Sequence, residues 1–337
     1  MIFILTIFLL LLNVSIYFVR NNIVKFYNVY DIPNKKRKIH KNKTPLIGGL
    51  IFYINFLLFF LITLLFPNLL DQALTVFESK ESYYLFFFFS STFFLIGYFD
   101  DKHDVNANLK FFIIIFLIML LLILDKSVII ESITFSFSER IFYLENYSLI
   151  FTLFCFLAFT NSYNLFDGIN LQIGIYSFFI FVILYIFSKN ILIFVFFYPL
   201  LIFLILNSKG KIFLGNSGSY FLSFVISYFF ISIFNNFNNI TSDQILAIMF
   251  LPGVDMIRLF IVRILNKKSP FAADKNHIHH KFLKIFSYKR TILFISMMSI
   301  TPFFANLGFK NYISFYFITI FYFFVIYILK ISIKSSS

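Results

Sequence analysis

Residues 83–104 read YYLFFFFSSTFFLIGYFDDKHD, an apolar run that ends in three carboxylates. A membrane-spanning helix takes roughly 17 to 25 residues, so the run is long enough to cross a bilayer. Asp100, Asp101 and Asp104 therefore lie where a predicted membrane helix meets water. Adjacent carboxylates repel one another unless protons or a cation neutralise them. The stretch predicts a site for a hard divalent ion at the end of this helix, and a solvated acidic helix end is the simpler alternative.

The composition of the whole chain is that of a polytopic membrane protein. Of its 337 residues, 60% are hydrophobic and 13% are charged, and the mean hydropathy is +0.90. These values exclude an ordinary soluble domain of this length. We expect one all-α integral-membrane domain over residues 1–337, with about eleven transmembrane helices at 1–20, 46–66, 83–99, 109–124, 147–166, 168–187, 190–206, 218–234, 245–264, 288–307 and 311–331.

The charges in the connections predict the orientation of the chain. Lys and Arg are concentrated in one alternating set, 20–45, 100–110, 161–167, 207–217, 263–290 and the C-terminal tail. Acidic residues outnumber basic ones in the other set, 67–82, 125–146, 188–189, 235–244 and 308–310. The positive-inside rule places the first set in the cytoplasm, the N-terminus outside and the C-terminus inside. All five His residues then lie on the cytoplasmic side, which predicts one active site there.

Two further features of the composition narrow the class of protein. The formal net charge is +13, but the basic residues border a membrane, where topology and anionic lipid account for them, and we expect no nucleic-acid partner. The single cysteine, Cys155, lies in an apolar run, which excludes a disulfide framework and a thiolate metal site. The first twenty residues have no basic start and no small-residue cleavage site, so we expect a retained helix.

A basic segment follows the first predicted helix. It reads DIPNKKRKIHKNKTPLIGG at residues 31–49. The lysines, including Lys41, are typical of a polybasic anchor at a membrane surface, and they could also contact an anionic head group. Gly48 and Gly49 in the first turns of a helix would let another backbone or a ligand come close.

Polar residues recur every three positions at the end of the fifth predicted helix. Asn161, Asn164 and Asp167 would project from one helical face. Such a wall can order a nucleotide, and interhelical hydrogen bonding is the alternative.

A glycine-rich turn precedes the eighth predicted helix. It reads KGKIFLGNSGS at residues 209–219, and backbone N–H groups at the start of a helix form a ready anion site. Phe213 in this turn is a candidate face on which a base could stack.

The last polar clusters lie in and after the ninth predicted helix. Asp255 and Arg258 are three residues apart and are expected to pair. The loop that follows contains His277, His279 and His280 among basic residues. Because the zinc ligands that would complete a site are missing nearby, we expect the imidazoles to bind a diphosphate.

Taken together, these clusters resemble the polyprenyl-phosphate N-acetylhexosamine-1-phosphate transferases, a WecA/MraY-like group of glycosyltransferase family 4. The motifs occur in family order from Asp31 to His280: DxPN with RKxH and PLIGG, GYFDD, NSYNLFDG, GxSGS, PGVD and SPFxxDxxHIHH. The resemblance implies Mg²⁺-dependent transfer (Mn²⁺ is an alternative) of a sugar 1-phosphate from a UDP-sugar to polyprenyl phosphate, with release of UMP. It implies a multi-pass protein of the inner (plasma) membrane, an early step in cell-envelope polysaccharide synthesis, and leaves a homodimer open.

The resemblance also implies roles for individual residues. Asp100 and Asp101 would be the catalytic acidic pair and metal ligands. Asn161, Asn164 and Asp167 would line the nucleotide site, Phe213 would face the uracil, and the three histidines with Lys41 would bind the anionic groups.

The chain departs from the family pattern near the predicted metal. Asn216 stands where the family usually has a metal-binding Asp, and Leu171 replaces a frequent Gly. A neutral oxygen attracts a dication less strongly, so a catalytically weakened homologue that only binds lipid or nucleotide sugar is one alternative. A transporter and a DDxxD prenyltransferase are the others. Transport sites are expected near the midplane of the membrane rather than at one face, and a prenyltransferase would leave the histidine loop unexplained.

Overall fold

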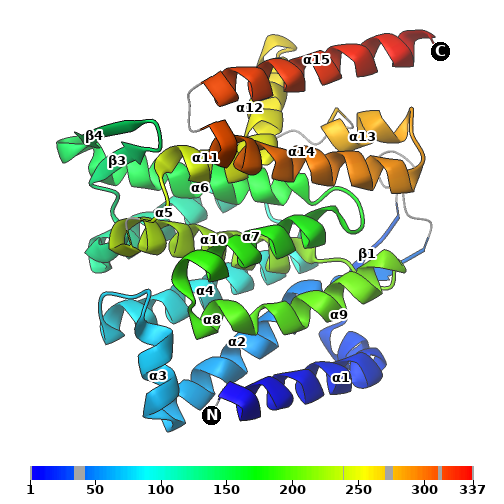
Figure 1. Ribbon diagram of the computed structural model, residues 1–337. Coiled ribbons are helices and arrows are strands. Elements are labelled where there is room, and N and C mark those ends of the chain that lie inside the picture. The colour runs from blue at the N-terminus through cyan, green and yellow to red at the C-terminus, as the bar shows by residue number, and fades with distance from the viewer. Residues whose placement is uncertain (1, 34–41, 238, 270–275, 310–312, 336–337) are drawn as a thin grey trace.

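The computed structural model describes residues 2–33, 42–237, 239–269, 276–309 and 313–335. Within these residues the fold is a bundle of helices, most of which lie side by side along one common direction (Figure 1). The long helices are α1 (Ile2–Tyr27), α2 (Gly48–Leu65), α4 (Lys80–His103), α5 (Ala107–Leu124), α6 (Ser148–Phe166), α7 (Gln172–Ser188), α9 (Phe197–Ser208), α10 (Gly215–Phe237), α12 (Phe250–Leu265), α14 (Tyr288–Phe309) and α15 (Ile313–Ser335). The prediction of an all-α polytopic membrane protein is confirmed.

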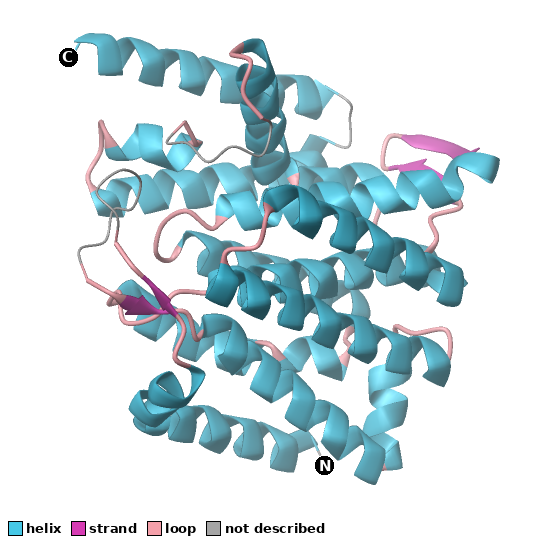
Figure 2. Ribbon diagram, turned by 180° about the vertical axis from the view of Figure 1, so that it is seen from behind, coloured by secondary structure: helices cyan, strands magenta, loops and turns pink. Residues whose placement is uncertain are grey.

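Short elements join the long helices at the two ends of the bundle. The short helices are α3 (Pro67–Leu74), α8 (Ile191–Val195), α11 (Ser242–Ile248) and α13 (Ile278–Leu283), with 3₁₀ turns at Lys126–Val128 and Glu145–Tyr147. Two antiparallel strand pairs complete the described residues: β1 (Tyr30–Asp31) with β2 (Thr44–Pro45), and β3 (Ser132–Phe135) with β4 (Ser138–Tyr143). The two pairs lie at opposite ends of the bundle (Figure 2).

Each of the eleven predicted spans coincides with a helix or a pair of helices, but in the described part of the chain fewer of these helices are long and apolar enough to cross a membrane. Among the described residues, eight helices are long and apolar enough to cross a membrane, and a ninth is added if α11 and α12 form one span. Those two helices meet at 71°. The new helix begins at Phe250, and Pro252 in its first turn has no N–H to donate to the preceding turn. The helix α7 and the Thr319–Lys330 part of α15 are shorter apolar helices.

Helix α10 is the centre of the bundle. Every residue from Ser217 to Phe234 is buried, so this helix has no lipid-facing side. It packs against α2, α4, α6 and α7. A helix that is hydrophobic on all sides belongs in a core, and its regularly spaced serines allow neighbouring helices to approach closely. The first turn of α10 therefore lies inside the protein and not at its edge.

Candidate active site

Glycines bring three helices together at the first turn of α10. A methyl group at Gly49 would come within 2.5 Å of Gly218 Cα, and one at Gly97 would come within 2.5 Å of the carbonyl carbon of Asn216. Gly48 lies against Phe213, whose carbonyl oxygen accepts a hydrogen bond from the Gly48 N–H at 2.9 Å. The prediction that Gly48 and Gly49 admit another backbone is confirmed. These contacts hold the DDxxD end of α4 beside the glycine-rich turn.

Replacing Gly49 with Ala should destabilise the protein, because the added methyl group has no room beside Gly218. Overpacking of this kind costs about 1–3 kcal/mol. The matched control is Gly308→Ala in α14, since nothing lies within 4 Å of a methyl group there. Thermal unfolding of the two purified variants tests this expectation, which is wrong if they unfold at the same temperature.

Asp101 caps the buried start of α10. Its Oδ1 accepts the Asn216 N–H at 2.8 Å, and its Oδ2 accepts the Ser217 N–H at 2.9 Å. The first N–H groups of a helix have no partner within the helix and favour negative charge. Gly215 precedes them with φ +77, a conformation that favours glycine. The carboxylate of one motif is therefore fixed by the backbone of another.

Asp100 points in a different direction from Asp101. Its carboxylate is 3% exposed, and Lys110 Nζ donates to Oδ1 at 2.9 Å and to Oδ2 at 2.8 Å. The Val105 N–H donates to Oδ1 as well, at 3.1 Å. Sequence reasoning missed Lys110, although it is the one charged residue in α5. That isolation within an apolar helix was the available signal.

The polar residues on one face of α6 have different hydrogen-bond partners. Asn164 Nδ2 donates to Asn216 Oδ1 at 3.1 Å and to Ser219 Oγ at 2.7 Å, which joins α6 to the first turn of α10. Asn161 instead donates to the Leu157 carbonyl oxygen of its own helix at 2.8 Å. The structure thus brings Asn164 to Asn216 but gives Asn161 a local backbone bond.

Asp167 ends α6 close to two other acids. Burial, followed by the negative charges of Asp101 and Asp31, raises the pKa of Asp167 to about 7, although part of the residue still reaches solvent. Asp31 belongs to β1, and sequence reasoning did not include it among the site residues. Three carboxylates from three motifs therefore repel one another here, and a cation would relieve this repulsion.

The predicted metal ligands fit a hard cation only in part. Of the predicted ligands, Asp101 and Asn216 supply the oxygen donors that Mg²⁺ prefers, and Asp167, which was predicted for the nucleotide site, is a further carboxylate nearby. Asp100 does not fit, because its charge is already paired with the Lys110 ammonium, whereas the Asp101 oxygens accept neutral backbone N–H groups. Among the described residues, no group of three His, Cys, Asp or Glu side chains is arranged to hold a metal ion. The donor chemistry therefore suits a cation beside Asp101. Asp100, which was also predicted as a ligand, is paired with Lys110 instead.

The histidine motif lies over the end of α6. The His279 ring packs directly on Gly168, where a side chain would collide with it. The rings of His277 and His279 are stacked with centroids 5.2 Å apart, and the His279 and His280 centroids are 4.4 Å apart. Burial, together with the other two imidazoles, lowers the pKa of His279 well below its usual range. His279 is therefore suited to packing, and binding of a diphosphate by the imidazoles stays a prediction.

The structure does not test the predicted ligand-binding roles of Phe213 and Lys41. The backbone of Phe213 is held by its N–H to the Pro45 carbonyl oxygen at 3.0 Å, and its ring is half-buried. Stacking of a uracil on this ring stays a prediction. Lys41 lies outside the described residues, as do residues 270–275 of the histidine loop.

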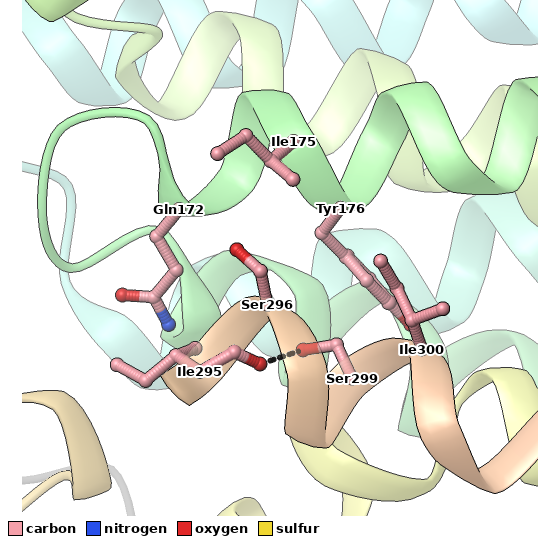
Figure 3. Close-up of a pocket in the computed structure, with 7 residues that line it drawn as sticks. All are labelled: Gln172, Ile175, Tyr176, Ile295, Ser296, Ser299 and Ile300. Carbon is pink, nitrogen blue, oxygen red and sulfur yellow. Dashed lines mark hydrogen bonds between the residues drawn. The ribbon is translucent and has the colours of Figure 1, made fainter. Parts of the chain in front are cut away.

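A narrow cavity lies between α7 and α14, away from these motifs. Gln172, Tyr176 and Ser299 are among the residues that line it, and Figure 3 shows the Gln172 amide pointing toward α14. The amide is buried and has no hydrogen-bond partner among the described residues. The cavity has no room for a water molecule. It is therefore too small for a nucleotide sugar, and the site described above is the candidate.

Acids, amides and imidazoles from separate motifs thus meet at one end of a membrane bundle, which defines the class as an integral-membrane enzyme that handles anionic substrates. Residues 83–234 match the model of glycosyl transferase family 4. Over these residues the chain is similar to that family.

Curated relatives agree with this family over most of the chain. The chain is similar to the undecaprenyl-phosphate alpha-N-acetylglucosaminyl 1-phosphate transferase of Yersinia pestis, with 25% identity over 86% of this chain and 80% of the relative. The protein of the same name from Escherichia coli K12 is 24% identical over 83% of this chain and 76% of the relative. A probable undecaprenyl-phosphate N-acetylglucosaminyl 1-phosphate transferase of Bacillus subtilis is 26% identical over 78% of this chain and 72% of the relative.

Proposed function

We propose that the protein transfers an N-acetylhexosamine 1-phosphate from a UDP-sugar to undecaprenyl phosphate. An oxygen of the lipid phosphate forms a bond to the sugar-bearing phosphorus. The bond from that phosphorus to the bridging oxygen breaks, and UMP leaves with the bridging oxygen. The observation that carries the proposal is the junction at the start of α10, where Asp101 binds two backbone N–H groups and Asn164 binds Asn216.

The chemistry of the junction supports this proposal. Both substrates are anionic, so the site must cancel their repulsion and stabilise negative charge on the departing UMP. Asp101, Asp167 and Asn216 would hold Mg²⁺, which would supply positive charge for the phosphates. Lys110, His277 and His280 add further basic groups around them. Asn164 would help to orient the nucleotide.

The direct test is release of UMP from a panel of UDP-sugars by purified protein supplied with undecaprenyl phosphate. We expect UDP-N-acetylglucosamine or a close epimer to be used, since the relatives are named for N-acetylglucosamine. Release of UMP must depend on the lipid phosphate. Intact, folded protein that releases no UMP from any sugar would contradict the proposal and favour a binding role.

We further propose eleven spans in the inner membrane, with the N-terminus outside and the site in the cytoplasm. The motifs lie at one end of the bundle with β1, and the β3–β4 pair lies at the other (Figures 1 and 2). Tags placed in 67–82 and 125–146 should react with impermeant reagents from outside the cell. Tags in 263–290 should react only after the membrane is opened, and the reverse pattern would contradict this orientation.

Replacing Asn216 with Asp should lower the Mg²⁺ concentration needed for half-maximal activity. The side chain contacts Asn164 and its own N–H contacts Asp101, so a new carboxylate would lie beside the proposed cation. A full negative charge attracts a dication more strongly than an amide does. A Mg²⁺ titration of the initial rate measures the effect, with Asn108→Asp at an exposed position as the control for added charge. If activity falls instead, like charges have been crowded, and the metal is not at this position.

A further inference from the structure

A buried polar cluster links helices α12 and α15 to the histidine motif. Asp255 of α12 is 4% exposed, and its Oδ1 accepts hydrogen bonds from Arg258 Nη2 at 2.6 Å and from Tyr322 OH at 2.9 Å. Arg258 Nε in turn donates to Tyr322 OH at 3.0 Å. The expected pairing of Asp255 with Arg258 is confirmed, but it occupies only one oxygen of the carboxylate.

The other oxygen of Asp255 faces the histidine motif. Asp255 Oδ2 lies 3.5 Å from His277 Nδ1 and accepts the Ile278 N–H at 3.4 Å. Arg258 Nη2 also donates to the Asn276 carbonyl oxygen, at 2.8 Å. The residues on both sides of His277 are therefore tied to α12. The ion pair between Asp255 and Arg258 does not by itself require these contacts with the histidine motif.

The imidazole of His277 is held so that its second nitrogen is available. A carboxylate beside Nδ1 keeps a proton on that nitrogen and fixes the ring orientation. Within the described part of the chain, Nε2 makes no hydrogen bond and is not among the buried atoms that lack a partner. The ring stacks on His279, which packs on Gly168 beside Asp167. His277 Nε2 thus lies at the same end of the site as the carboxylate group.

We propose that Asp255 is a positioning residue that acts through His277. It orients the ring so that Nε2 binds a phosphate group of the anionic substrate, and Tyr322 of the C-terminal helix α15 holds Asp255 in place. The identity of that substrate rests on the proposed function, whereas binding of a diphosphate does not. The regions that carry this device, α12, α13 and α15, lie at one edge of the molecule (Figure 1) and outside residues 83–234, which match the family model.

The test uses inorganic pyrophosphate as the probe, at constant Mg²⁺, and measures stabilisation of the full-length protein against thermal unfolding. Asp255→Asn and His277→Gln should each weaken the apparent affinity for pyrophosphate about tenfold, as expected for loss of one hydrogen bond to a charged group. Because one residue acts through the other, the double variant should bind no more weakly than His277→Gln alone.

A milder variant keeps the test informative if Asp255→Asn does not fold, since that change leaves the Arg258 charge without its partner. Tyr322→Phe removes only a hydroxyl and should weaken pyrophosphate binding severalfold. Tyr327→Phe on the exposed side of the same helix is the matched control and should have no effect. In a turnover assay, the loss in Tyr322→Phe should appear in KM for the UDP-sugar more than in kcat.

Three results would overturn the inference: no stabilisation of the wild type by pyrophosphate, equal affinity in Asp255→Asn or, failing that variant, in Tyr322→Phe, or additive losses in the double variant. Additive losses would mean that Asp255 affects pyrophosphate binding independently of His277. These outcomes do not depend on catalysis. Pyrophosphate binding that requires Asp255, in a protein that releases no UMP, would support the positioning role and contradict the proposed function.

Discussion

Replacing Asp101 with Asn is expected to reduce release of UMP by roughly 10²- to 10³-fold, the loss typical of removing one preorganised electrostatic contact. The amide would present an N–H₂ group to one of the two N–H groups that Asp101 now accepts. It would also remove the negative charge of an acid that acts on Asp167 and contacts the start of α10. Both the proposed cation and the helix terminus would then lose negative charge.

The stability of the Asp101 variant must be separated from its activity. One unsatisfied N–H costs about 1–3 kcal/mol, so the variant should unfold at a lower temperature but remain folded at assay temperature. Glu81→Gln, an exposed acid at the opposite end of the same helix, is the matched control and should keep wild-type turnover. Undiminished UMP release by folded Asp101→Asn would place the cation elsewhere.

The sequence predicted the helices well, because apolar runs in a membrane leave the backbone no other partner. It could not predict how they are assembled. The all-round burial of α10 depends on which helices surround it, and its sequence is no more apolar than that of lipid-facing α5. The 71° bend between α11 and α12 was marked by Pro252, but hydropathy alone merged the two helices into one span.

The site was predicted in its motifs but not in its contacts. Consecutive residues on a helix point about 100° apart, and in the structure Asp100 and Asp101 contact different partners. Leu171 shows the same limit in a second motif. It has φ +69, and its N–H is held by Asn207 Oδ1 at 2.6 Å. The backbone at Leu171 therefore has a conformation that favours glycine, which sequence reasoning noted only as a departure from the family pattern.

The separation of the two acids leads to a second large expected effect, at Lys110. Lys110→Met leaves the Asp100 carboxylate buried without its cation, and breaking such a pair costs about 3–5 kcal/mol. Lys102→Met, at an exposed position on the last turn of α4, is the matched control and should be nearly neutral. Thermal unfolding of the two variants gives the comparison, and equal unfolding temperatures would show that the pair contributes nothing to stability.

The double variant Asp100→Asn/Lys110→Met then separates packing from chemistry. With both charges removed, no buried charge is left without a partner. Most of the lost stability should therefore return. Release of UMP should nevertheless stay reduced by roughly 10²-fold, because two phosphate substrates would meet without the ammonium group and without the carboxylate that orients it. Recovery of both stability and wild-type turnover would show instead that Asp100 and Lys110 serve only to join α4 to α5, and that Asp101 alone carries the chemistry of the acidic motif.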